Sequence, residues 1–510
     1  MRSLREKLHE STDFLTGVEL VSIRGTMAAK SALKARRFAH ELVECDRVDW
    51  ISITDNAGGN PQLAPHSLGK PILYAGKEVV IHLTCKDLNR NGLESEAWAL
   101  HSEGFQNILA MTGDYPVAGN DGLAKPVFDI DSVGLIAMLS KMNRGFDHTE
   151  LVDPSHEPKY EKTAFNIGAV TTNFKRLEGE LVPQYLKLRR KTQAGASFII
   201  NQIGYDSRKI HELRVYMDHH GMKRIPLIGN VYLLNPRVAK LFNSQRIPGV
   251  VVSDKLLQLC QKQADSPDKG KAFFLELAAK QVAIYRGLGY RGAYIGGAHD
   301  AETIRRALDI EKSFSDDDWK RFAREICFSQ PGEYFHYQED SSTGLADPEA
   351  PTAPTPKSSP SFHYSLSRWM HDHVFAPETT FARLGRKACA NAKDPAQGPA
   401  PLRVLEHASK AMLYRCRDCG DCSLPDIAYL CPESQCAKNQ RNGPCGGTRD
   451  GRCEVDGYGD CIWLRAHERL KAAGNVDSLL THRAMVQNQG LRHTSAWANN
   501  WLKRDHHAKP

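Results

Sequence analysis

Short apolar runs separated by longer amphipathic stretches organise the first 300 residues. Stretches such as 179–195 and 271–288 place apolar residues at helical spacing, and Gly195 is suited to end the first of these helices. Continuous apolar runs between such helices are typical of buried parallel strands. Eight runs are present, at residues 17–23, 49–55, 78–85, 107–114, 164–171, 197–204, 224–234 and 292–298.

Eight alternations of strand and helix predict an α/β fold, specifically a (β/α)8 TIM barrel. A doubly wound open sheet is the alternative, but no early G-x-G-x-x-G follows the first run. Residues 339–361 contain five prolines with Ser, Thr and Ala, which predicts a semi-rigid, largely extended linker. We therefore predict a barrel over 1–337, a linker over 338–361 and a smaller C-terminal domain over 362–510.

The C-terminal domain is distinguished by its cysteines. Eight of the thirteen cysteines fall within one stretch: Cys416, Cys419, Cys422, Cys431, Cys436, Cys445, Cys453 and Cys461. The first three form Cys-x2-Cys-x2-Cys, a spacing that brings thiolates to one metal centre. Eight ligands suffice for two [4Fe-4S] clusters or, alternatively, for two structural zinc sites. The remaining five cysteines are scattered, and we interpret them as ordinary thiols.

Net charge and the distribution of apolar residues argue against a nucleic-acid-binding, membrane or secreted protein. The net charge is only +7, and most of the excess lies beyond residue 360, beside the cysteines. Cations there offset the negative charge of thiolate–metal centres, so nucleic-acid binding is not expected. No apolar segment is long enough to span a membrane, and the start of the chain lacks a secretory signal. We therefore expect a cytoplasmic protein with reduced cysteines.

Polar residues gather at the ends of the predicted strands, where barrel enzymes place their chemistry. Each residue alone has a structural explanation, such as a turn or a satisfied core histidine, but the set covers seven of the eight strands. Burying polar groups is unfavourable unless they have partners or a ligand. The set comprises Glu19, Thr54, Asp55, His82, Thr84, Thr112, Gly113, Asp114, Thr171, Thr172, Asn173, Asn201, Gln202 and Asn230.

Several segments resemble the flavin-dependent 5,10-methylenetetrahydrofolate reductase family in consistent order over about 300 residues. They are HLTCKDLNR, NILAMTGDYP, KPVFDIDSV and AGASFIINQIGYD, with Glu19 in the opening strand. The cysteine region, with its N-G-P-C-G-G run at 442–447, resembles the C-terminal domain of some bacterial members and the small partner subunit of acetogen-type reductases. That second likeness favours iron–sulfur clusters.

The resemblance implies an enzyme that interconverts 5,10-methylenetetrahydrofolate and 5-methyltetrahydrofolate. Glu19 matches the catalytic acid, Asp114 the acid near flavin and pterin, and Gln202 the amide that orients the pterin. The implied cofactor is FAD rather than FMN, and the implied partners are a tetrahydrofolate derivative and NAD(P)H or another electron carrier; a homo-oligomer is compatible with the family. The expected cofactor-binding residues are Thr54, His82, Thr112, Gly113, Asp114, Ala169 and Lys191, the last offering a cation to the cofactor phosphates.

Two departures from the family pattern affect the flavin site. Ala169 and Asn173 stand where well-studied members carry a tyrosine and a histidine. These changes motivate an alternative, a non-redox folate or one-carbon carrier that serves a methyltransferase and has a structural zinc tail. A zinc-ribbon module beside a degenerate barrel, binding nucleic acid, is a third hypothesis. The direction of the reaction does not follow from the sequence.

Overall fold

A closed barrel of parallel strands forms the N-terminal part of the protein in the computed structural model, which describes residues 2–116, 119–145, 161–244, 246–353, 359–481 and 484–508. Strands pair in chain order and β1 pairs with β8 to close the ring, which confirms the predicted TIM barrel. The strands are β1 (Leu15–Leu20), β2 (Trp50–Ile53), β3 (Glu78–Thr84), β4 (Asn107–Met111), β5 (Asn166–Thr171), β6 (Phe198–Asn201), β7 (Leu227–Tyr232) and β8 (Gly292–Gly296).

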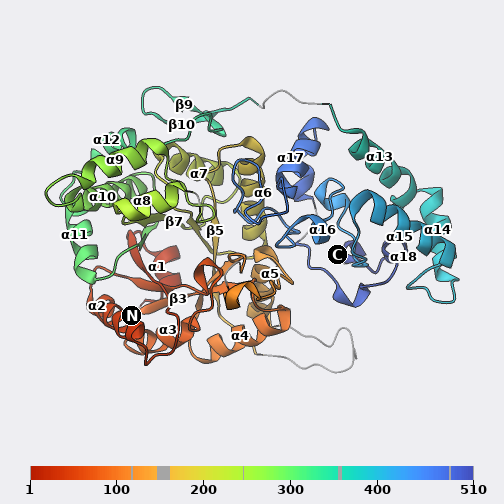
Figure 1. The fold of residues 1–510 in the computed structure, drawn as a ribbon, viewed down its shortest axis with the longest axis horizontal. Coiled ribbons are helices and arrows are strands. Elements are labelled where there is room, and N and C mark those ends of the chain that lie inside the picture. Colours follow the sequence, from red (N-terminus) through yellow and green to blue (C-terminus); the bar gives the residue numbers. More distant parts are fainter. Residues whose placement is uncertain are drawn as a thin grey trace.

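Helices surround this ring (Figure 1). Gly195 ends α6 in the left-handed conformation, with φ of 117°, as the sequence predicts. The short α1 differs from the surrounding helices, because it buries Leu4 and Leu8 against residues of the barrel interior. The helices are α1 (Leu4–Glu10), α2 (Lys30–Glu44), α3 (Pro65–Tyr74), α4 (Arg90–Ser102), α5 (Ser132–Arg144), α6 (Glu178–Ala194), α7 (Ser207–His219), α8 (Pro236–Asn243), α9 (Asp254–Ala264), α10 (Lys271–Gly287), α11 (Ala301–Lys312) and α12 (Asp318–Glu325).

Because side chains alternate along each strand, the strand residues face either the helices or the interior of the barrel. On β1, Val18 and Leu20 pack in the large core between strands and helices, whereas Leu15 belongs to the separate core inside the barrel. Because side chains alternate along a strand, Glu19 shares the inward face with Leu15. On β3, the same rule places His82 on the inward face with Val80. The barrel interior is therefore apolar below and polar at its C-terminal mouth.

The predicted linker is wrong over its first half. Residues in this segment form an antiparallel hairpin of β9 (Tyr337–Asp340) and β10 (Leu345–Pro351). Tyr337, Leu345 and Ala346 are buried in the barrel core, so apolar side chains at only three positions tie the hairpin to the barrel. Residues 354–358 of the predicted linker lie outside the described residues.

The C-terminal part combines helices with the irregular cysteine-bearing segment (Figure 1). Its own core is small and is formed around Ile427, Leu430, Ile462 and Trp463, together with Leu186 of α6. Its helices are α13 (Phe362–Met370), α14 (Thr380–Ala390), α15 (Ala400–Tyr414), α16 (Pro432–Gln435), α17 (Ile462–Ala472) and α18 (Ala496–Trp501), with short turns η5 (Pro425–Ile427) and η8 (His506–Ala508). Leu186 in this core shows that the two parts pack directly on each other.

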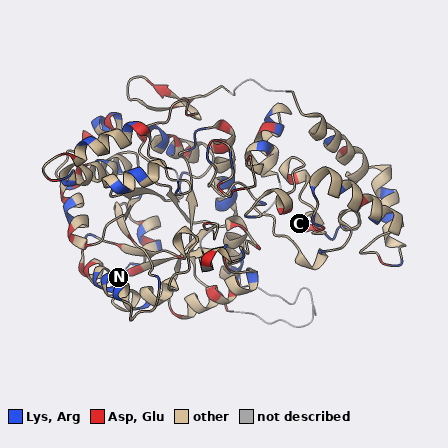
Figure 2. Ribbon diagram, viewed as in Figure 1, with Lys and Arg blue, Asp and Glu red and all other residues tan. Residues whose placement is uncertain are grey.

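Charged residues are mixed over both parts. Figure 2 shows Lys and Arg interspersed with Asp and Glu along the helices, in keeping with the small net charge. Among the described residues, none of the helices combines the length and the apolar character needed to cross a membrane.

Candidate active site and cysteine centres

A cavity of about 460 Å³ opens at the C-terminal mouth of the barrel. Its walls combine strand ends and loops of the barrel with a loop of the C-terminal part. A volume of this size is typical of small-molecule sites. Eight of the predicted catalytic and cofactor-binding residues line it: Glu19, Thr54, His82, Thr112, Gly113, Asp114, Lys191 and Gln202.

Glu19 lies on the inward face of β1 beside Tyr294 and Gly296 of β8. Tyr294 Oη donates to Glu19 Oε1 at 3.4 Å. A methyl group at Gly296 would lie 2.9 Å from Glu19 Oε2, so a larger residue there would push the carboxyl group from this position. Enclosure within the barrel raises the pKa of Glu19, while the hydrogen bond from Tyr294 opposes that rise. Glu19 is thereby suited to hold a proton.

A chain of polar groups continues from Tyr294 across the barrel. Ser52 lies near Tyr294 and lowers its pKa slightly against the larger effect of burial, and Ser52 Oγ lies 2.8 Å from His82 Nε2. Burial lowers the pKa of His82 to about 4, so its ring is neutral near neutral pH. A neutral imidazole bonded to Ser52 can offer its other nitrogen to a ligand without adding charge.

The loops after β2 and β4 are joined through the predicted site residues. Thr54 Oγ1 accepts a hydrogen bond from Ser22 N at 3.0 Å. Asp114 Oδ2 accepts from Gly58 N at 2.8 Å, which holds the loop after β4 against the loop after β2. Gly113 has φ of 86°, a left-handed conformation that favours glycine. Thr112 Oγ1 donates to Gln440 Oε1 of the C-terminal part at 3.3 Å.

Lys191 lies near the C-terminal end of α6, and Gln202 directly follows β6. The Lys191 ammonium group donates to Val170 O at the end of β5. Burial, together with the neighbouring Lys187, lowers the pKa of Lys191 to about 7. Gln202 Oε1 accepts from Ile203 N at 2.9 Å, which fixes the amide with its nitrogen available for a ligand. Both side chains line the cavity.

Ala169 is the exception among the predicted residues. It is fully buried in the core between strands and helices, whereas the neighbouring Val170 and Thr172 line the cavity. Alternation along β5 explains the difference, because residue 169 is on the outward face. Asn173 is likewise fully buried, with its amide donating to Lys209 O at 2.9 Å. The structure therefore does not bring the side chain of either residue to the cavity.

The C-terminal part supplies cavity residues that the sequence analysis did not identify as site residues. Lys438 Nζ lies 2.5 Å from Glu454 Oε1 and donates to Gly113 O at 2.8 Å. Both side chains are almost fully buried, with relative exposures of 5% and 7%. Lys438 is one of the cations beside the cysteines in the sequence. Nothing in the local sequence pattern indicated that its side chain reaches the barrel mouth.

Two buried lysines of the barrel hold the C-terminal part in this position. Lys187 Nζ donates to Gln440 Oε1, Gly443 O and Pro444 O at 2.9, 3.1 and 3.0 Å. Lys175 Nζ donates to the carbonyl oxygens of residues 446 and 448, each at 2.6 Å. Charged donors to buried carbonyls are among the stronger hydrogen bonds in proteins. The loop over 440–448 is consequently fixed over the barrel mouth.

The eight clustered cysteines separate into two groups of four. Group 1 lines one small cavity with Lys410 and Arg441, and group 2 lines another with Lys438 and Trp463. Cys445 of group 2 also lines the cavity at the barrel mouth, so this group is the one beside the barrel. Group 1 is Cys416, Cys419, Cys422 and Cys431; group 2 is Cys436, Cys445, Cys453 and Cys461.

Spacing of the thiols bears on what each group can hold. A tetrahedral zinc site with Zn–S bonds near 2.3 Å places its sulfur atoms roughly 3.8 Å apart. Among the described residues, which include all eight cysteines, no three thiols have sulfur atoms within 4.8 Å of one another. The donor sets are therefore more open in this structure than a single zinc ion requires, and all-thiol sets are the ligands that iron–sulfur centres use.

Comparison with known proteins identifies both parts of the chain. Residues 26–289 match the family model described as methylenetetrahydrofolate reductase. Residues 400–489 match the model described as the C terminal of methylene-tetrahydrofolate reductase. The first match alone covers more than half of the chain.

Two individual relatives are named 5,10-methylenetetrahydrofolate reductase. The protein from Salmonella typhimurium is 28% identical over 159 residues, and the one from Pectobacterium carotovorum is 26% identical over 158. Each alignment covers 31% of this chain and 45% of the relative, so the chain spans less than half the length of these relatives.

Two solved structures align with this chain at low identity. An uncharacterised protein from Clostridium thermocellum that binds two copies of 5-methyl-5,6,7,8-tetrahydrofolic acid aligns with a TM-score of 0.41 and 11% identity, covering 61% of this chain and 97% of its own. EDTA monooxygenase from Chelativorans sp. BNC1 aligns with a TM-score of 0.34 and 13% identity, covering 60% of this chain and 95% of its own.

The match over residues 26–289, joined to the separate C-terminal match, shows that the chain belongs to the methylenetetrahydrofolate reductase family.

Proposed function

We propose that this protein is a flavin-dependent oxidoreductase that interconverts 5,10-methylenetetrahydrofolate and 5-methyltetrahydrofolate. The observation that carries the proposal is Glu19, a carboxyl group of raised pKa that lines a cavity at the mouth of a barrel of this family. Reduction of the methylene bridge adds a hydride and a proton to the substrate. The raised pKa of Glu19 supports its role as the group that holds this proton.

The cavity suits a flavin with a pterin beside it. Its volume is within the range of small-molecule sites. Two buried polar atoms at its wall, Gln184 Nε2 and Glu454 Oε2, have no hydrogen-bond partner within the described protein, and such atoms are expected to bond a ligand. Lys191 supplies a cation for phosphate groups, whose charge would raise its pKa above the present value of about 7. When bound, the flavin supplies hydride transfer.

The protein's own residues have distinct tasks in this scheme. Glu19 donates a proton to the bridged ring of the folate, which opens the ring for reduction, and recovers the proton in the reverse direction. Gln202 can both donate to and accept from the pterin through its amide. Asp114, held by Gly58 N, places negative charge near the cofactor. His82 stays neutral and contributes hydrogen bonding alone.

We further propose that each cysteine group would hold a [4Fe-4S] cluster, and that a cluster held by group 2 would supply electron transfer beside the barrel mouth. Two observations support this assignment. The thiols are widely spaced, and Cys445 lines both the group 2 cavity and the cavity at the barrel mouth. Burial raises the pKa of Cys419 and of Cys436 to about 12, so the thiolate form requires a cationic centre. The electron partner is then NAD(P)H or another carrier that reaches group 1 or the flavin.

An anaerobic half-reaction tests the proposed activity. Purified protein, with flavin, iron and zinc quantified, is mixed with 5-methyltetrahydrofolate while flavin absorbance is followed. We expect the flavin absorbance to bleach, and the reduced flavin to be reoxidised by 5,10-methylenetetrahydrofolate. Flavin-loaded protein that shows neither reaction would refute the proposal. A flavin-free preparation that still binds folate would support the non-redox carrier instead, and mass spectrometry of the released cofactor distinguishes FAD from FMN.

A further inference from the structure

A cluster of two histidines and one aspartate lies in the C-terminal part, beside group 1 of the cysteines and apart from the residues assigned to the active site. Asp426 belongs to η5, between Cys422 and Cys431, and His506 and His507 belong to η8. We propose that these three side chains form a mononuclear metal site, with Zn²⁺ as the ion that the ligand set suits, and that the ion ties η8 to the cysteine-bearing loop.

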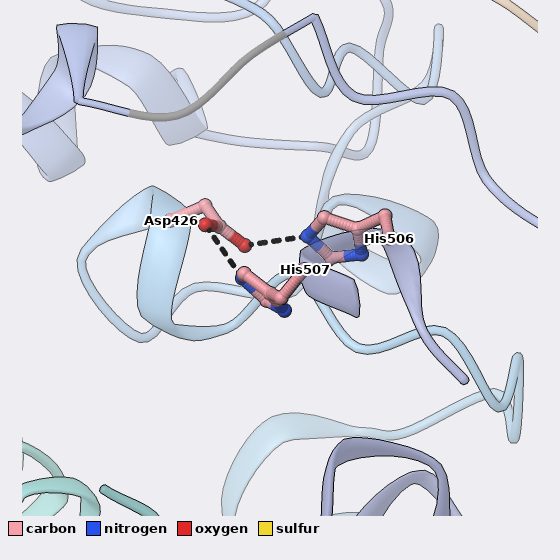
Figure 3. A group of neighbouring side chains, drawn as sticks. All are labelled: Asp426, His506 and His507. Carbon is pink, nitrogen blue, oxygen red and sulfur yellow. Dashed lines mark hydrogen bonds and ion pairs between the residues drawn. The ribbon is translucent and has the colours of Figure 1, made fainter. Parts of the chain in front are cut away.

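The geometry of the three side chains matches a single ion. Both imidazole rings point at the same carboxylate (Figure 3). His506 Nε2 lies 3.1 Å from Asp426 Oδ2, and His507 Nε2 lies 3.0 Å from Asp426 Oδ1. The three potential ligand atoms lie within 4.8 Å of one another. Nitrogen and oxygen ligands about 2.0–2.2 Å from tetrahedral zinc are separated by roughly 3.3–3.6 Å, so only small shifts are needed.

Each histidine is also oriented from behind by another carboxylate. His506 Nδ1 lies 2.5 Å from Asp421 Oδ1, and His507 Nδ1 lies 3.4 Å from Asp505 Oδ2. Metal-binding histidines usually donate their second ring N–H to a carboxylate or carbonyl, which fixes the tautomer and leaves the other nitrogen for the metal. Both histidines share this arrangement, although the two carboxylates come from different segments.

Charge gives an independent reason for a cation between the rings. If each Nδ1–H is donated to its outer carboxylate, both Nε2 lone pairs face the oxygens of Asp426, and these contacts are repulsive. Protonating both rings would also remove that repulsion; it would place two imidazolium rings with their centroids 3.8 Å apart, among the carboxylates of Asp421, Asp426 and Asp505. One divalent ion among the three ligand atoms satisfies all lone pairs and leaves both rings neutral.

Burial supports a built site with one accessible side. The side chains of Asp426 and Asp421 are 6% and 0% exposed. His507 is one-third exposed and lines a cavity of about 100 Å³ together with His371 and Asn500. Three protein ligands and an open position toward a cavity leave room for a water molecule as the fourth ligand.

Zinc content and coordination test this site in the full-length protein. Protein carrying its iron and sulfide is given Zn²⁺ and desalted, and we expect one retained zinc per chain. X-ray absorption should show nitrogen and oxygen neighbours at about 2.0–2.1 Å, without the sulfur neighbours at about 2.3 Å that thiolate-bound zinc produces. Absence of retained zinc, or a sulfur environment for it, would overturn the proposal in favour of an ion-pair network.

Variants locate the ion. His507→Gln and Asp426→Asn should each lose the zinc while the iron content stays unchanged, and Asp505→Asn should lower zinc affinity about 10- to 100-fold. His493→Gln is the control, because His493 is an exposed histidine of the same part that pairs with an aspartate, Asp418, outside the proposed site. If Asp426→Asn fails to fold, the more exposed His507→Gln decides the question. Retention of zinc with unchanged coordination in His507→Gln would refute the site.

Discussion

Glu19 depends on its neighbours for the chemistry proposed for it. The pKa is raised by enclosure in the barrel, and Gly296 leaves the space that the carboxyl group occupies. Glu19→Gln keeps the shape of the side chain but removes the acid. We expect folate turnover to fall about 10²- to 10⁴-fold, the usual range for a general acid, while reduction of the flavin by its own electron donor is retained. Stopped-flow measurement of the two half-reactions separates these effects.

Stability provides the control for that variant. A carboxyl group with a raised pKa binds its proton more tightly in the folded state, so its stabilising contribution is complete below the unfolded pKa of about 4.5 and is lost as pH rises through the folded pKa. Gln has no such dependence. Glu19→Gln should therefore be at least as stable as the wild type at pH 8, as measured by thermal unfolding. A less stable variant that loses both half-reactions would contradict the acid role.

Tyr294 offers a finer test of the same carboxyl group. Its hydrogen bond lowers the pKa of Glu19 against the larger effect of enclosure. Tyr294→Phe removes that bond, so the pKa rises further and the protonated form persists to higher pH. We expect the alkaline limb of the pH profile for folate reduction to move to higher pH.

The matched control for this variant is Tyr290→Phe. Tyr290 is also buried, but its hydroxyl group donates to Ile210 O at 2.8 Å in the core between strands and helices. Its substitution should leave the alkaline limb in place. An unchanged limb in Tyr294→Phe, or an equal shift in both variants, would contradict the proposed coupling.

At the scale of elements, α6 connects the barrel to the C-terminal part through Lys187. Lys187→Met keeps the length and apolar stem of the side chain but removes the donor to Gly443 O and Pro444 O, while Gln440 Oε1 keeps its hydrogen bond from Thr112 Oγ1. Because each unpaired buried group costs about 1–3 kcal/mol, we expect a loss on the order of 3 kcal/mol in the free energy of unfolding, together with easier proteolysis of the loop over 440–448. Urea unfolding and limited proteolysis measure the two effects.

Lys240→Met is the control, because Lys240 is exposed on α8. Similar losses in both variants would show that Lys187 has no special role in holding the two parts together.

The same elements show which features sequence reasoning can predict. The eight strands were predictable because apolar runs between amphipathic helices are a local signal, and the polar strand ends followed from the architecture of parallel barrels. The orientation of Ala169 was not found because family likeness assigns a position but not a face. The β9–β10 hairpin was missed because its proline content indicates a linker, whereas the buried Tyr337 and Leu345 that attach it are too few to form a periodic pattern.

At the scale of the whole molecule, the barrel and the C-terminal part together form the walls of the cavity at the barrel mouth. The cysteine spacing predicted metal centres, but their division into groups depends on contacts between residues distant in the sequence. Lys438 and Glu454 reach the barrel mouth only because the loop over 440–448 packs there. The apolar spacing along the sequence reports the helices and strands within each part. It does not show which surfaces of the two parts pack together.

Cys445 is the residue at which this arrangement can be tested, because it lines both the group 2 cavity and the barrel mouth. Cys445→Ser removes one thiolate from group 2 and should lower the iron content from about eight to about four atoms per chain if each group holds one [4Fe-4S] cluster. We expect bleaching of the flavin by 5-methyltetrahydrofolate to persist, whereas electron transfer between the flavin and an external carrier should fall at least tenfold. Cys389→Ser is the matched control, because Cys389 is a buried thiol of α14 outside both groups. Full electron transfer in a Cys445→Ser variant that has lost its iron would show that electrons reach the flavin without group 2.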